Sequence, residues 1–231
     1  MAEAAVFNLP VDHLVALVPD LEAAGAAFRA AGFTTTPLAH HSAAMGTANI
    51  CVMFGNGYLE LMGIVTETEA NAGWRSLLAQ GPGLRGVAFE SHDIAATHHA
   101  LEEAALAPEP VRHFARNVPE GELRFSITRL SREITPGLQC LYCQHHTRDL
   151  LWLPHLMQHD NQAVAMLGAC LPDAASLAPL QVPDLLAAEA LLPLTAGPSA
   201  LTLSLTEGAA PPSEAALAGV HATSGLSLQF R

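Results

Sequence analysis

Apolar and polar positions define two alternating kinds of segment along the first part of the chain. Short runs rich in Val, Ile, Leu and Phe have the length and composition of strands, and Ala-rich runs between them have helical character. The first series predicts a strand at 11–18, a helix at 21–31, and strands at 33–38, 48–54 and 58–65. The predicted order is therefore β-α-β-β-β.

A second series repeats this order. It predicts a strand at 86–90, a helix at 94–106, and strands at 111–117, 122–130 and 138–145. Gly and Pro at 119–121 and 136–137 supply the turns between the last strands. We therefore expect one β-α-β-β-β module in residues 1–80 and another in residues 81–158.

A short motif marks the start of three helical segments. Asp20, Asp93 and Asp173 each follow an apolar run and precede an Ala-rich stretch, which is typical of helix N-caps. The third copy is weaker, with strands expected at 163–169, 200–205 and 226–230, helical character at 184–192, and several interrupting prolines. We interpret 159–231 as a degenerate third module that completes a sheet within the chain or across a homodimer.

The composition of the chain argues against nucleic acid and membranes as binding partners. Half of the 231 residues are apolar, 14% are charged, and the formal net charge is −12, so no basic surface is expected for nucleic acid. Pro, Gly or charged residues interrupt every apolar segment before the roughly 20 residues that a membrane span needs. The N-terminus has no basic region followed by an apolar core. The sequence predicts a soluble cytoplasmic protein that binds neither nucleic acid nor membrane.

The four cysteines are expected to be buried free thiols. All of them, Cys51, Cys140, Cys143 and Cys170, fall in predicted strands, where a thiol behaves as a small apolar group. Cys140 and Cys143 form a C-x-x-C pair, but strand alternation places them on opposite faces. A shared metal ion or a disulfide between these two is therefore not expected.

Several motifs occur in a familiar order. They are His13 on the opening strand, Gly46-Thr47-Ala48-Asn49, Tyr58-Leu59-Glu60-Leu61 and Cys143-Gln144-His145. With the duplicated β-α-β-β-β order, about two-thirds of the chain resembles the vicinal oxygen chelate superfamily, in its glyoxalase-like branch of glyoxalases, bleomycin-resistance proteins and extradiol dioxygenases. The resemblance implies an α+β fold in which paired modules form one curled, mostly antiparallel, cup-shaped sheet around a divalent metal ion.

The resemblance also implies where the metal ligands lie, on the first and last strands of each module. The matching positions are His13, Glu60, Gly86 and one residue of 144–146. Gly86 has no side-chain donor, although it lies seven residues before Asp93 as His13 lies seven before Asp20. We choose His145 as the third ligand by the resemblance, because spacing does not decide among Gln144, His145 and His146. A set of His13, Glu60 and His145 suits Fe, Mn, Ni or Zn.

His13 and Glu60 each have a structural alternative. A single strand histidine is commonly a hydrogen-bonded core residue; as a ligand, its second nitrogen would be held by Asp12 or a backbone carbonyl. Glu60 lies between Leu59 and Leu61, so it points to the face opposite those two leucines. That face is either the interior of the cup, where a carboxylate needs a partner, or solvent.

Three further residues are candidates for catalysis or substrate binding. His41 precedes a strand near the mouth of the cup and could act as a general base together with Glu60, or it is a surface histidine. Asn49 could donate a hydrogen bond to a substrate oxygen, or satisfy a turn. Arg116 belongs to an arginine-rich second module and could bind a substrate carboxylate, or pair with surface acids.

These features predict a metal-dependent enzyme of lyase, isomerase or dioxygenase type, acting on a small oxygen-rich substrate chelated to the ion. The alternative is a metal-free protein that sequesters a small molecule, as bleomycin-resistance proteins do. Gly86 and the apolar bias favour that alternative. A third hypothesis gives residues 159–231 a structural or partner-binding role.

Overall fold

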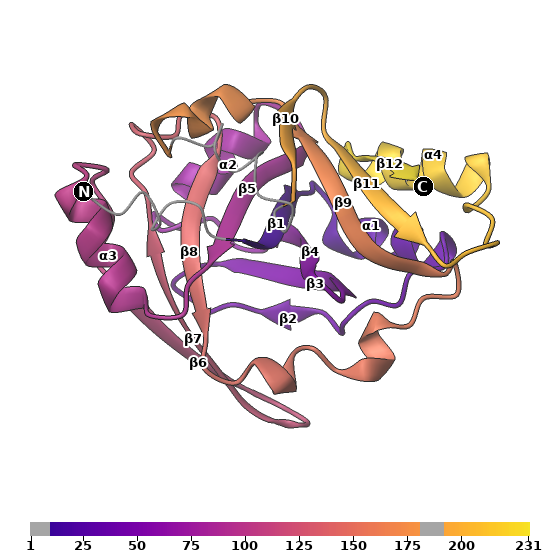
Figure 1. Cartoon of the computed structure of the whole chain (residues 1–231), viewed down its shortest axis with the longest axis horizontal. Coiled ribbons are helices and arrows are strands. Elements are labelled where there is room, and N and C mark those ends of the chain that lie inside the picture. The colour runs from indigo at the N-terminus through magenta and orange to yellow at the C-terminus, as the bar shows by residue number, and fades with distance from the viewer. Residues whose placement is uncertain (1–9, 181–191) are drawn as a thin grey trace.

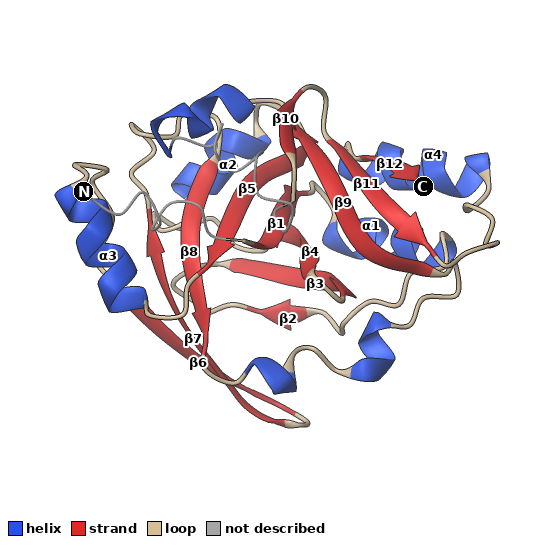
Figure 2. Cartoon of the chain, in the orientation of Figure 1, coloured by secondary structure: helices blue, strands red, loops and turns tan. Residues whose placement is uncertain are grey.

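A curled sheet of eight strands dominates the computed structural model, which describes residues 10–180 and 192–231 (Figures 1 and 2). The order of its strands is β2-β3-β4-β1-β5-β8-β7-β6. They are β1 (Val11–Leu17), β2 (Ala39–His40), β3 (Thr47–Phe54), β4 (Gly57–Ile64), β5 (Gly83–Glu90), β6 (Arg112–Val118), β7 (Gly121–Arg129) and β8 (Gln139–His145). Five of the seven neighbouring pairs are antiparallel, as predicted for the cup.

The two modules meet at their first strands. In each module the first strand runs parallel to the last, β1 beside β4 and β5 beside β8, whereas β1 and β5 are antiparallel. His13 pairs with Ala88, and Val15 pairs with Gly86. This reciprocal register relates the modules by an approximate twofold axis and makes Gly86 the counterpart of His13. The predicted β-α-β-β-β order is confirmed, and the boundaries at 80 and 158 stay predictions.

The first two motif aspartates cap the module helices as predicted. Asp20 accepts a hydrogen bond from the Ala23 amide at the start of α1 (Leu21–Ala30). Asp93 accepts bonds from the amides of Ala95 and Ala96 in α3 (Ile94–Glu103). Each carboxylate therefore satisfies amides that have no partner within the helix.

Three elements differ from the prediction. Residues 33–38 form no strand: Pro37 has no amide hydrogen, and regular pairing begins only at β2. α3 ends at Glu103 rather than near 106, because the chain turns through a left-handed conformation at Ala105 (φ 57°). The helix α2 (Ala72–Leu78), in the connection between the modules, was not predicted.

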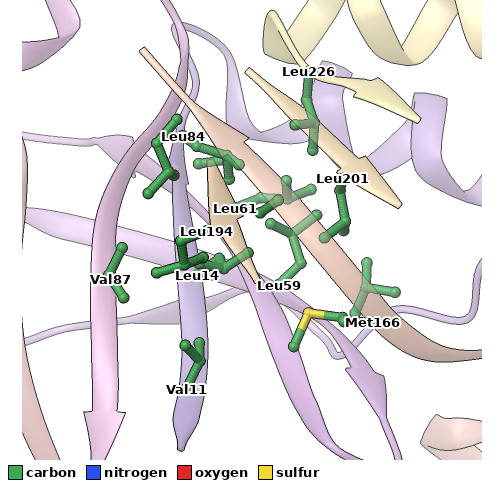
Figure 3. Close-up of a cluster of buried hydrophobic side chains, with 14 of the residues drawn as sticks. Val11, Leu14, Leu59, Leu61, Leu84, Val87, Met166, Leu194, Leu201 and Leu226 are labelled. Carbon is green, nitrogen blue, oxygen red and sulfur yellow. The ribbon is translucent and has the colours of Figure 1, made fainter. Parts of the chain in front are cut away.

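The C-terminal region forms a second, separate sheet rather than completing the first. Its strand order is β10-β9-β11-β12, with the bounds β9 (Ala163–Leu171), β10 (Leu194–Ala196), β11 (Ala200–Leu205) and β12 (Ser227–Phe230). Figure 3 shows Leu14, Leu59 and Leu61 of the main sheet facing Leu194, Leu201 and Met166 of the second. The second sheet thus buries part of the outer surface of the cup, beside β3 and β4, whereas α3 contacts β7 and β8. Homodimer formation stays a prediction.

The third motif aspartate does not act as its two counterparts do. Asp173 precedes a 3-10 helix (Ala174–Leu180) that contains Pro179, and its carboxylate lies 3.0 Å from the guanidinium of Arg85. The expected α-helical cap is therefore wrong here, because a proline and a long-range ion pair replace the regular helix. The predicted helical segment 184–192 lies, except for its last residue, outside the described residues.

The helix α4 (Glu214–Ser224) was not predicted from the sequence. Ser213 caps it, Gly225 ends it in a left-handed conformation, and it packs beside α1. No helix within 10–180 and 192–231 has the length and apolar character needed to cross a bilayer.

The cysteines follow the prediction with one exception. Cys51, Cys140 and Cys143 are buried free thiols, whereas Cys170 is partly exposed. Cys140 joins the core on the outer face of the cup, and Cys143 joins an apolar cluster on the inner face. The C-x-x-C pair therefore lies on opposite faces of β8, as alternation requires.

Candidate functional site

The concave face of the main sheet contains a cavity of about 330 Å³. Strands β1, β3 and β4 of the first module form one wall, and β6, β7 and β8 of the second form the other. The predicted site residues all line it: His13, His41, Asn49, Glu60, Arg116 and His145. A cavity of this size lies at the lower end of the range for small-molecule sites.

His13 is fixed by its neighbour in the sequence. A register shift in β1 between Val11 and His13 leaves Asp12 as an extra residue, and the Asp12 carboxylate lies 2.6 Å from His13 Nδ1. Such a bulge changes the direction of the side chains beside it, and here it allows the successive residues Asp12 and His13 to contact each other. The ring also stacks on Tyr58, with centroids 4.4 Å apart. The expected support by Asp12 is confirmed, and Nε2 is the ring nitrogen of His13 that is left to face Glu60 and the cavity.

Glu60 faces His13 across the floor of the cavity. Its Oε2 lies 3.7 Å from His13 Nε2, and its Oε1 accepts a hydrogen bond of 2.8 Å from Asn49 Nδ2. Leu59 and Leu61 point to the opposite face, into the core shared with the second sheet. The carboxylate is therefore buried and faces inward, and is not on a solvated strand face.

His41 lies against the other oxygen of this carboxylate. Its Nε2 is 3.7 Å from Glu60 Oε1, and its Nδ1 is 2.6 Å from the Thr47 hydroxyl. Burial lowers the pKa of His41, and the charge of Glu60 opposes this only in part. The imidazole is therefore neutral at pH 7 and able to accept a proton.

His145 enters the cup, and its two neighbours in the sequence do not. The Gln144 carboxamide accepts from the Ile94 amide at the start of α3, and His146 contacts the Ser126 hydroxyl. His145 Nε2 lies 3.0 Å from the same Asp12 oxygen that holds His13. Asp12 thus bridges two imidazoles, an arrangement that sequence reasoning found only for His13.

The donors that form a group of three include only one of the predicted ligands, His145. Within the described residues, Asp12, Cys143 and His145 have donor atoms within 4.8 Å of one another and form a candidate metal site. Burial disfavours ionisation of Asp12, but hydrogen bonds and charge from His13 and His145 outweigh it and hold the Asp12 pKa well below its usual range. Burial, with the nearby charges of Asp12 and Glu60, raises the pKa of the Cys143 thiol well above its usual value. Without an ion, this group is a charged hydrogen-bond network beside a neutral thiol.

The sheet register gives the second module different residues at the positions of His13 and Glu60. Glu60 pairs with Val15 of β1, and Leu141 pairs with Ala88 of β5, so Leu141 is the counterpart of Glu60. His145 lies four residues further along β8. The role of His145 as third ligand therefore stays a prediction that the twofold relation does not support.

Comparison with known proteins agrees with this architecture. Residues 11–180 match the family model described as the Glyoxalase-like domain. The chain belongs to this family. It is thus a member of the vicinal oxygen chelate superfamily, and the resemblance seen in the sequence is confirmed. No curated protein matches the chain significantly in sequence.

Solved structures of similar fold include a hypothetical protein from Staphylococcus aureus, with 11% identity, a TM-score of 0.69, and coverage of 96% of this chain and 98% of that one. A methylmalonyl-CoA epimerase from Streptomyces coelicolor has 19% identity and a TM-score of 0.46, over 60% of this chain and 99% of that one. The methylmalonyl-CoA epimerase from Mycobacterium tuberculosis has 17% identity and a TM-score of 0.46, over 62% of this chain and 92% of that one. Identities this low establish similarity of fold alone.

In this glyoxalase-like protein, Trp74 of α2 occupies the space beside Gly86. A Cβ atom at position 86 would lie 3.1 Å from Trp74 Cη2 and 2.9 Å from Val15 Cβ. Trp74 packs there with Val15, Met62 and Leu77 in a small buried cluster. The position that a second-module ligand would occupy is therefore filled by an apolar side chain.

His13 and Glu60 fit a divalent metal ion. One offers an imidazole nitrogen and the other a buried carboxylate, both donor types that Fe, Mn, Ni and Zn accept. Asp12 supplies the second contact to the imidazole that is usual for histidine ligands. The structure thus brings these two predicted residues to 3.7 Å from each other at the cavity.

Proposed function

We propose that this protein is a metal-dependent enzyme of lyase, isomerase or dioxygenase type that acts on a small, oxygen-rich substrate in the cup. The main support is the facing pair of His13 Nε2 and Glu60 Oε2, 3.7 Å apart on the floor of a cavity of about 330 Å³. A buried carboxylate beside an oriented imidazole is costly without a cation, and a bound ion would offset that cost.

His13 and Glu60 would hold the ion, with His145 as the predicted third ligand. A bound divalent ion would polarise a substrate oxygen and stabilise the negative charge that develops on it. The wall of the second module offers Leu141 and Gly86 at the symmetric positions, so coordination positions remain for two adjacent substrate oxygens.

The remaining side chains would bind the substrate and move its protons. His41 would accept a proton at Nε2, the nitrogen that faces the site, while the Thr47 hydroxyl holds Nδ1. Glu60, 3.7 Å away, would share this role as well as binding the ion. Asn49 donates to Glu60, and its buried Oδ1 has no partner within the described residues, so it can accept from a substrate hydroxyl. Arg116 would contact an anionic group of the substrate.

A second function, sequestration of a small apolar or aromatic molecule without metal, is favoured by one observation. The second-module wall carries apolar side chains where ligands would lie, including Leu141, and Trp74 fills the space beside Gly86. In this alternative the facing imidazole and carboxylate would recognise a polar group of the bound molecule.

Metal binding separates these two functions. The full-length chain, freed of metal with a chelator, is titrated by calorimetry with Zn²⁺, Ni²⁺, Mn²⁺ and, without oxygen, Fe²⁺. We expect one ion per chain and a loss of at least about 100-fold in affinity in the H13A/E60Q variant, because both proposed ligands are removed. H146A is the matched control, since His146 lies just beyond the same strand as His145 but contacts Ser126 outside the cup.

Two outcomes would contradict the proposal. Binding that survives H13A/E60Q but fails in C143S and H145A would assign the ion to the group of Asp12, Cys143 and His145. A protein that binds none of the four ions, yet binds small molecules in the cup, would support sequestration.

A further inference from the structure

Two arginines enter the cavity from the second module without a partner. Arg116 on β6 and Arg129 on β7 both line the cavity. The Nε atom of each is buried and has no hydrogen-bond partner in the described part of the chain. Within the same residues, neither guanidinium forms an ion pair with a carboxylate. Sequence reasoning selected Arg116 and missed Arg129.

Two other arginines on the same two strands are paired. Arg112, also on β6, lies 3.2 Å from Glu109, and Arg124 lies 3.7 Å from Glu122. Pairing with acidic residues therefore explains these two, but not Arg116 and Arg129. Both side chains are partly exposed, but a guanidinium nitrogen removed from water without a partner is costly, so an unpaired Nε at a cavity indicates an anion that binds there.

The charges of both arginines act inside the cup. Burial lowers the pKa of Arg129, which is the expected effect of removing a cation from water. Arg116 and Arg129 line the same cavity as His41 and Glu60, on the opposite wall. Their positive charge therefore faces the region that these two residues occupy.

The surface around the two arginines is apolar. Phe114 and Phe125 stack with ring centroids 5.3 Å apart, and Ile127 and Leu141 continue the same wall. A ligand that fits this wall has an apolar or aromatic body, and a cavity of about 330 Å³ limits it to a small molecule or one end of a longer molecule.

We propose that Arg116 and Arg129 form an oxyanion subsite, and that the natural ligand is a small organic anion, a carboxylate or a phosphate ester, with an apolar or aromatic body lying along Phe114 and Phe125. The inference rests on the proposed function in one respect, since the other end of the ligand would face His13 and Glu60. Planar guanidinium groups bind carboxylate and phosphate oxygens through paired hydrogen bonds.

Calorimetry on the full-length, chelator-treated chain tests this subsite without metal. The probes are phenylacetate, phenyl phosphate and the neutral phenylacetamide. We expect one of the two anions to bind at least tenfold more tightly than phenylacetamide, and the better anion identifies the group. R116M and R129M should each weaken anion binding about tenfold or more, because a charge-assisted hydrogen bond is lost. R112M is the matched control on the same strand and should change nothing.

Thermal unfolding of the ligand-free variants supplies a second readout. R129M should unfold at a higher temperature than the natural chain, because a partly buried charge without an ion-pair partner is replaced by an apolar side chain of similar length. Equal binding of phenylacetamide and both anions, or anion binding unchanged in R116M and R129M, would overturn the inference. These anion-binding experiments contain no metal, so their outcome does not depend on whether the H13A/E60Q titrations support the proposed metal site.

Discussion

The two halves of the cup carry different chemistry on equivalent strands. In the first module, β1 and β4 present His13 and Glu60 to the cavity; in the second, β5 and β8 present Gly86 and Leu141 at the matching positions. The backbone duplication is therefore retained while the donor atoms are not. The first half carries two of the three proposed ligands, whereas the second carries His145, apolar surface and two arginines that line the cavity.

The loss of donors in the second half is linked to a new contact. Gly86 leaves room beside β5, and Trp74 from the connection between the modules occupies it. Because Trp74 also lines the cavity, it limits the size of the cup at that end. The comparison thus predicts that the apolar half stabilises the fold and the polar half binds the ion.

Replacing Trp74 should have the largest effect on stability. W74A removes a buried indole from its cluster and should lower the free energy of unfolding by about 3–5 kcal/mol, as for other buried aromatic residues. Urea unfolding followed by circular dichroism measures this, with W74F as the conservative control. A loss below about 1 kcal/mol would show that Trp74 does not hold this end of the cup together.

Filling the space at Gly86 should have the next largest effect. G86A places a methyl group 2.9 Å from Val15 Cβ and 3.1 Å from Trp74 Cη2, and should cost about 1–3 kcal/mol. G55A is the matched control, because a Cβ at Gly55 meets nothing within 4 Å.

A double-mutant cycle tests the link between positions 74 and 86. The penalty of G86A should fall in the W74A background, with an interaction energy of about 0.5–3 kcal/mol. An unchanged penalty would assign the whole clash to Val15, and Trp74 would then not explain the glycine.

A smaller effect is expected from the residue that orients His13. D12N replaces the carboxylate shared by His13 and His145 with a neutral amide, and should weaken metal binding about 10–100-fold without removing a proposed ligand. D20N is the control, since Asp20 lies beyond the end of the same strand and asparagine also caps helices well. Unchanged affinity in D12N would show that Asp12 supports the fold rather than the ion.

The helices and strands of the two modules could be predicted because each depends on residues that are close together in the sequence. Asp20 and Asp93 cap helices through amides within three residues, and the apolar face of each strand follows from alternation. Alternation also placed Glu60 on the face opposite Leu59 and Leu61, but it did not decide whether that face is the interior of the cup or solvent. The pairing of these modules into a cup came from the family resemblance.

Other features depend on contacts between distant segments. The bulge at Asp12, the counterpart relation of Glu60 and Leu141, and the insertion of Trp74 beside Gly86 are set by register across the sheet. The Asp173 carboxylate binds the guanidinium of Arg85, which is nearly ninety residues away in the sequence. For the same reason the C-terminal strands, recognisable one by one, gave no sign that they form a separate sheet.

The central claim is that a single divalent ion lies between His13 and Glu60, in the polar half of the cup. A crystal structure of the full-length chain with bound Co²⁺, located by anomalous scattering, tests it most directly. The account predicts one strong peak within about 2.0–2.2 Å of His13 Nε2 and a Glu60 oxygen, and none beside Trp74. A peak held instead by Asp12, Cys143 and His145, or no peak in the cup at all, would contradict it.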